Sequence, residues 1–189
     1  MGTIDALVTE ILAGLGEPQE REILAVARRI WGSERPKSVE SLLHMILAGK
    51  ALALVDGLSC IEESFLTMIE FSYRLPASVV KAVDGFELSA DHSAAHVASM
   101  VKPLVERGSF DACELFSAMI TIAELDNLSP EELAAASYVG EALGLSPAVI
   151  TMLVDWSRFE RTGRLVGLTS VKLAATRHLV LNACVESTA

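Results

Sequence analysis

Hydrophobic residues recur every three or four positions along most of this 189-residue chain. That spacing is typical of amphipathic α-helices, which turn one face toward a core. The clearest stripe near the N-terminus consists of Ile4, Leu7, Val8, Ile11, Leu12 and Leu15. No segment shows the strict alternation of apolar and polar residues that marks a half-buried strand. The pattern predicts an all-α protein of about nine or ten helices.

Serine residues mark several of the predicted helix starts. Ser38, Ser59 and Ser129 each precede an apolar periodic stretch, where a serine side chain can accept a hydrogen bond from the first turn. Glu62 and Glu132 follow the last two serines at the spacing of a capping box. Further helices are predicted around Ile23–Ile30, Ala77–Val83, Asp91–Pro103, Phe110–Leu125 and Pro147–Trp156, and from Thr169 or Ser170 to Val180, with a loop at Gly163 and Gly167.

Part of the chain occurs twice at a constant spacing of 70 positions. Four identical pairs carry the repeat: Asp56 and Asp126, Leu58 and Leu128, Ser59 and Ser129, and Glu62 and Glu132. The first copy covers about residues 42–86 and the second about residues 112–156. A repeat of this length predicts a duplicated helix-turn-helix with pseudo-two-fold symmetry rather than a solenoid. No linker rich in Ser, Gly or Pro divides the chain, so residues 1–189 are expected to form a single domain.

The repeated acidic turn resembles the TerB (tellurite-resistance B) and DjlA N-terminal family, whose motif is similar to Ala-Asp-Gly-x-Ile-Ser-x-Glu-Glu. The resemblance covers about residues 40–157. The matching residues are Asp56, Gly57, Glu62 and Glu63 in the first copy, and Asp126, Leu128, Ser129, Glu131 and Glu132 in the second. The second copy departs from the motif, because Asn127 replaces the glycine and the acidic pair comes one residue earlier.

The resemblance implies a cytoplasmic, stress- or tellurite-resistance-associated helical protein that is not an enzyme. It also implies a divalent cation (Ca²⁺, Mg²⁺, Mn²⁺ or Zn²⁺) at the paired acidic turns. The ligand candidates are Asp56, Glu62, Glu63, Asp126, Glu131 and Glu132. Several carboxylate oxygens suit a hard cation if the two turns face each other. The alternative reading is structural: the glutamates cap helices and the aspartates form ordinary turns.

Charge narrows the classes of partner. The formal net charge is −10, which argues against a nucleic-acid-binding surface and against docking on anionic lipid. Basic residues gather after Trp156, namely Arg158, Arg161, Arg164, Lys172 and Arg177. They are expected to form a solvated helix face, with a docking patch as the alternative. No apolar run is long enough to insert into a membrane, and no secretory signal is recognised at the N-terminus.

The histidines and cysteines are weaker candidates for a metal site than the acidic turns. His92 and His96 are four positions apart on one predicted helix, but no third zinc ligand stands beside them, so a solvated or cap-proximal pair is expected. His44 and His178 lie in apolar stretches and are expected to be packed or rim residues. The three cysteines, Cys60, Cys113 and Cys184, fit neither a zinc spacing nor a disulfide framework, so buried free thiols are expected.

Three hypotheses of function remain. The first is a non-catalytic TerB-like binding or scaffold protein with a cation at the acidic turns. The second is a metal-free adaptor that presents an apolar groove to a partner helix. The third is an enzyme with a pocket between the repeats, which ranks last because no nucleophile, acid or base set stands out. With 51% hydrophobic residues, the chain is also compatible with a homodimer.

Overall fold

The computed structural model describes residues 3–31, 35–88, 92–124, 128–165 and 170–186, and every regular element within them is helical. The helices are α1 Ile4–Ala13, α2 Glu17–Trp31, α3 Val39–Ala53, α4 Cys60–Ser72, α5 Ala77–Asp84, α6 Ala94–Val101, the 3₁₀ turn η1 Lys102–Leu104, α7 Phe110–Ala123, α8 Pro130–Ala142, α9 Pro147–Leu165 and α10 Ser170–Glu186. The predicted all-α class is confirmed for these residues. None of the helices among them is long and apolar enough to cross a bilayer.

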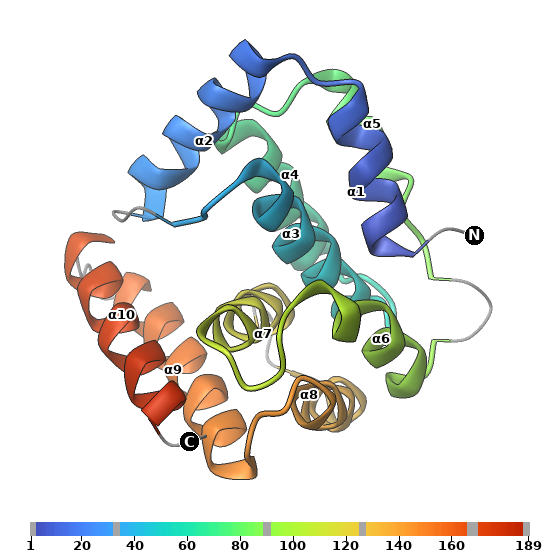
Figure 1. Ribbon diagram of the computed structural model, residues 1–189. Coiled ribbons are helices and arrows are strands. Elements are labelled where there is room, and N and C mark those ends of the chain that lie inside the picture. The colour runs from blue at the N-terminus through green and yellow to red at the C-terminus, as the bar shows by residue number, and fades with distance from the viewer. Residues whose placement is uncertain (1–2, 32–34, 89–91, 125–127, 166–169, 187–189) are drawn as a thin grey trace.

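Helices α3 and α7 form the centre of the molecule, and the other helices surround them (Figure 1). Every residue from Leu42 to Ala53 of α3 is buried, and so is every residue from Ala112 to Ile120 of α7. A helix that is apolar on all sides needs neighbours on all sides. The largest fully buried side chains accordingly come mainly from these two helices, with Phe116 among them.

The two central helices run in the same general direction. Their N-terminal halves meet at one cavity, which is lined by Ser41, His44 and Met45 of α3 and by Asp111, Glu114 and Leu115 of α7. Their C-terminal halves meet where Gly49 faces Ile122, so closely that a Cβ on Gly49 would overlap the end of the Ile122 side chain. The C-terminal ends of α3 and α7 therefore lie at the same end of the core.

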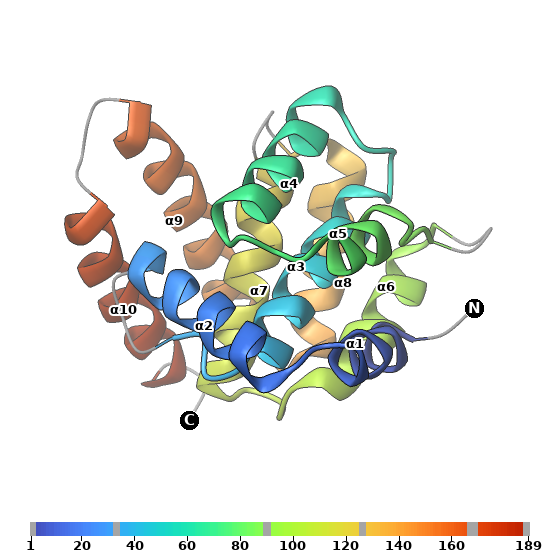
Figure 2. The same ribbon diagram turned by 90° about the horizontal axis from the view of Figure 1, so that it is seen from above.

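The outer helices gather in groups around this pair. Helices α9 and α10 lie side by side and pack on α7, whereas α1 packs on α3 and α5 (Figures 1 and 2). Helix α6 packs on α8 and α3, and α4 contacts both central helices. Figure 2 shows α4 at the periphery, with one side turned away from the body.

The helix boundaries agree with the 70-residue spacing. Helix α4 begins at Cys60 and ends at Ser72, and α8 begins at Pro130 and ends at Ala142. After each of them a residue adopts a left-handed conformation, Arg74 at φ 55° and Gly144 at φ 83°. The next backbone N–H then bonds back to the carbonyl five residues earlier, a Schellman-type closure. The two copies of the motif thus start and stop their helices at equivalent positions.

Several boundaries differ from the prediction. Helix α6 begins at Ala94, because Ser93, not Asp91, caps it by accepting a hydrogen bond from the His96 N–H. Asp91 itself lies outside the described residues. Helix α9 continues through Gly163, which was predicted to be a loop, and it ends at Leu165. Buried residues on α9 as late as Glu160 hold it against its neighbours, and such tertiary contacts outweigh the low helix propensity of one glycine.

Candidate functional site

The first acidic turn is tied into the start of α4. The Ser59 Oγ accepts from the Glu62 N–H at 3.2 Å, and the Glu62 carboxylate accepts from the Ser59 N–H at 2.8 Å. This is the predicted capping box. Glu62 is only 2% exposed, so its carboxylate is committed to the helix end. Asp56 and Glu63 are exposed.

The second acidic turn repeats this arrangement at the start of α8. The Ser129 Oγ accepts from the Glu132 N–H at 3.0 Å, and the Glu132 carboxylate accepts from the Ser129 N–H at 2.8 Å. Glu132 is buried, whereas Glu131 is exposed at the second position of the helix. Glu62 and Glu132 are therefore equivalent in structure. Asp126 lies outside the described residues.

Within the described part of the chain, one group of three His, Cys, Asp or Glu side chains lies near enough to share a metal ion, and it contains none of the six candidates from the acidic turns. It is made of Asp5, Glu40 and His44. Because Asp126 is not described, a cation shared between the two turns stays a prediction.

An ion cluster around a buried glutamate at the end of α7 was not predicted from the sequence. Glu124 is buried directly before the second acidic turn, and its carboxylate accepts a hydrogen bond from Arg158 Nε at 3.2 Å. Arg161 donates to the Glu124 carbonyl oxygen at 2.9 Å and lies 3.6 Å from its carboxylate. Two of the basic residues after Trp156 thus neutralise a buried glutamate. Because both arginines lie far from Glu124 in the sequence, no local pattern predicted this pairing.

A second cluster joins the segment before α3 to α7. Arg35 binds the Glu114 carboxylate with Nε at 3.0 Å and with a second guanidinium nitrogen at 2.7 Å. Arg35 also bonds to Asp111, and its guanidinium lies 4.8 Å from the centre of the Phe110 ring. Lys37 bonds to Asp111 at 2.8 Å. The adjoining cavity is about 90 Å³, and its charged walls already pair with each other.

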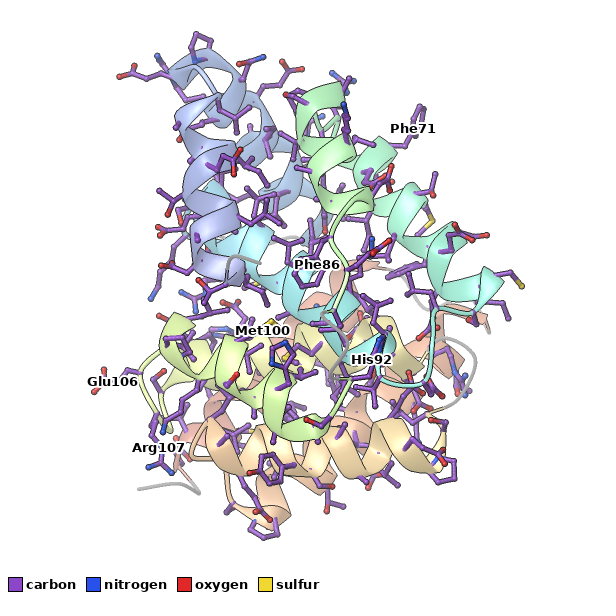
Figure 3. The ribbon with its side chains drawn as sticks, turned by 90° about the vertical axis from the view of Figure 1, so that its right-hand side faces the viewer. Phe71, Phe86, His92, Met100, Glu106 and Arg107 are labelled. Carbon is purple, nitrogen blue, oxygen red and sulfur yellow. The ribbon has the colours of Figure 1, made fainter. Side chains whose placement is uncertain are left out.

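His92 and His96 do not lie on one helix, although the sequence predicted both of them there. His92 precedes α6, and its Nδ1 lies 2.9 Å from the carbonyl oxygen of Leu54, just after α3. Figure 3 shows His92 near the end of α6 that faces the α3–α4 connection. His96 lies inside the first turn of α6. The pair is therefore divided between a turn contact and a helix start, in agreement with a cap-proximal role.

The three cysteines differ in burial. Cys113 of α7 and Cys184 of α10 are fully buried, and a hydrogen bond between their thiols, together with burial, raises the pKa of Cys113. A raised pKa keeps the thiol protonated and unreactive. Cys60 is exposed at the first position of α4, so the expectation of burial was wrong for this residue. The helix start that places Cys60 at the surface is set by its neighbour Ser59.

Comparisons with protein-family models, with curated proteins and with solved structures returned no match to this chain. The resemblance to the TerB-like family therefore rests on the repeated motif of the sequence.

Proposed function

We propose that this chain is a non-catalytic, TerB-like binding or scaffold module that docks a partner helix on α4. The observation that carries the proposal is the exposure of three large apolar side chains on that helix. Phe71 is 85% exposed, Ile61 50% and Met68 49%. Their spacing of seven and three positions puts them on one helix face. Figure 3 shows Phe71 pointing away from the body of the protein.

This face, defined as Ile61, Ser64, Thr67, Met68 and Phe71, has the composition of an interaction surface. It carries no charge, although the whole chain has a net charge of −10. Burying a whole Phe, Met or Ile side chain contributes roughly 1.5–3 kcal/mol, so covering the exposed parts of these three side chains would stabilise a complex. Contiguous exposed apolar side chains rimmed by polar ones commonly mark sites of association.

The occupant that fits is an amphipathic helix with an apolar face and basic flanking residues. Its apolar residues at positions i, i+3 and i+7 would meet the α4 face. Its basic residues would meet Glu63 and Asp56, which are exposed at the N-terminal end of the same helix and in the turn before it. The surface proposed for docking is an exposed helix face, whereas the sequence favoured an apolar groove. Neither the cavity beside Arg35 nor the one beside Glu17 includes an α4 residue.

A site-specific cross-linker tests this proposal. Benzoylphenylalanine replaces Phe71 in one variant and the exposed Phe159 of α9 in a matched control, and the adducts formed in cells are mapped by mass spectrometry. The expected adduct at position 71 is an amphipathic helical segment of another protein. A synthetic peptide of that segment should bind the purified chain, and Phe71→Ala should weaken binding by at least about 10-fold. An adduct on α4 of a second copy would instead identify a homodimer. Identical adducts at both positions would contradict the proposal.

A second candidate function is divalent-cation binding at the acidic turns. It is favoured by the common direction of α3 and α7, because the C-terminal ends of both helices, each of which precedes one acidic turn in the sequence, lie at the same end of the core. Arg158 and Arg161 add positive charge beside the second turn, and for this reason it ranks below helix docking. Titration with Ca²⁺, Mg²⁺, Mn²⁺ and Zn²⁺ should raise the melting temperature if the site exists. The rise should disappear in the Asp56→Asn, Asp126→Asn double variant.

A further inference from the structure

Asp5, Glu40 and His44 lie together where α1 packs on α3. Asp5 is in the first turn of α1, and Glu40 is in the first turn of α3. His44 follows Glu40 by four positions, so both side chains lie on the same face of α3. One ligand atom from each of the three residues lies within 4.8 Å of the others. Two carboxylates and one imidazole thus converge from two helices.

The imidazole of His44 is the unusual member of this group. His44 is only 8% exposed, and its Nε2 has no hydrogen-bond partner in the structure. Its nearest charged neighbour is Oδ1 of Asp5 at 3.6 Å, which is too long for a hydrogen bond. A buried polar nitrogen normally has a partner, because leaving it unpaired costs roughly 1–3 kcal/mol. A cation between Nε2 and the carboxylates would supply one.

The protonation state is compatible with metal binding. Burial lowers the pKa of His44, and the nearby charges of Glu40 and Asp5 oppose this effect only in part. Burial thus favours the neutral imidazole, which is the form that binds metals. Asp5 and Glu40 are exposed, so their carboxylates can rotate inward at little cost.

We infer that Asp5, Glu40 and His44 form a binding site for a divalent transition metal, with Zn²⁺ as the preferred ion. Metal bonds of about 2.0–2.1 Å in a tetrahedral site put ligand atoms about 3.3 Å apart. The 3.6 Å between Nε2 and Asp5 is already close to this value, and rotation of the exposed carboxylates closes the rest. An imidazole nitrogen selects Zn²⁺ and similar ions over Ca²⁺ and Mg²⁺, which prefer oxygen ligands alone.

Three protein ligands leave a fourth position for water, as in open zinc sites. The ion would join α1 to α3 and would bind only the folded chain, so it would also stabilise the fold. At a free Zn²⁺ concentration of 100 times Kd, the melting temperature should rise by about 5–10 °C. This site shares no residue with the α4 face or with the acidic turns. An experiment can therefore disprove one of the three proposals and leave the other two standing.

Cobalt titration of the metal-free chain tests the inference. The Cys60→Ser background removes the exposed thiol, and Co²⁺ reports the site by its visible absorption band. We expect saturable binding of one Co²⁺ per chain that Zn²⁺ displaces. Asp5→Asn or Glu40→Gln should weaken binding by at least about 10-fold, and His44→Gln by about 100-fold or more with loss of the band.

Matched controls separate this site from general acidity. Glu10→Gln removes a carboxylate from the same helix α1, and a triple variant of Asp56→Asn, Glu63→Gln and Glu131→Gln removes carboxylates from the acidic turns. Both should bind Co²⁺ like the parent, and circular dichroism checks that each variant is folded. The inference is overturned if no saturable binding occurs below about 1 mM metal. It is also overturned if Asp5→Asn and Glu40→Gln leave the affinity unchanged.

Discussion

Replacing Glu70 by glutamine should make the stability of this protein much less dependent on pH. Glu70 is 5% exposed on α4 and lies beside Asp84 at the end of α5. Burial, followed by the negative charge of Asp84, raises the pKa of Glu70 from 4.5 to about 7, and the positive charge of Lys50 only partly opposes this. Lys50 is occupied elsewhere, since its Nζ donates to the carbonyl oxygens of Val83 and Asp84 at 2.8 and 2.9 Å.

The direction of the effect follows from proton linkage. The folded state holds the Glu70 proton more tightly than the unfolded state, so this group stabilises the fold fully below about pH 4.5. The contribution is lost as the pH rises through about 7. Each pKa unit corresponds to about 1.36 kcal/mol, which gives about 3 kcal/mol for this shift. Screening of the exposed Asp84 by water reduces the figure, and we expect roughly 2–3 kcal/mol.

Urea unfolding of the parent and of Glu70→Gln between pH 5 and pH 8 measures this difference. As the pH rises from 5 to 8, the free energy of unfolding of the variant should gain roughly 2 kcal/mol relative to that of the parent. The buried amide can shift the stability of the variant by a constant amount, but this does not change the trend with pH. Glu63→Gln is the matched control, because it removes an exposed carboxylate from the same helix and should show no such trend. Asp84→Asn should give part of the effect by removing the neighbouring charge. A stability difference that stays constant from pH 5 to pH 8 would refute the reasoning.

Three further predictions concern the packing that holds the candidate sites in place. Gly49→Ala should destabilise the fold by about 1–3 kcal/mol in urea, because its Cβ overlaps a side chain of α7, and an unchanged midpoint would contradict this close approach. Ser129→Ala should cost about 1 kcal/mol by removing the cap of α8, and a value near zero would argue that the capping box contributes little. The double change of Arg158→Ala and Arg161→Ala should cost about 1–3 kcal/mol by leaving the buried Glu124 carboxylate without its arginine partners, and adding Glu124→Gln should restore much of it. If the added change restores nothing, the arginines act through packing rather than charge.

Helix starts were the features best predicted from the sequence. The capping boxes at Ser59 and Ser129 form as expected, because a cap depends on residues within one turn of each other. Helix ends were predicted less well. Gly163 lies inside α9 because that helix is held by contacts from other parts of the chain, and no local signal reports those contacts.

The role of individual carboxylates was harder to predict. The sequence placed Glu62 and Glu132 among metal ligands as one option and among helix caps as the other, and the structure shows both in caps. Nothing in the sequence predicted a role for Glu124, although two arginines neutralise its carboxylate. Burial decides which carboxylates need a partner, and burial depends on helix packing.

The order of the amino acids was enough to predict that this chain folds into helices and where most of them begin, and it shows a short motif repeated at a spacing of 70 positions. These features follow from interactions between residues three or four positions apart, which the order of side chains fully specifies. The approach of Asp5 to Glu40 and His44, and the exposure of Phe71 on α4, are visible only once the helices are packed. Those outcomes depend on which helix faces pack together across the core, and a three- to four-residue period does not contain that information.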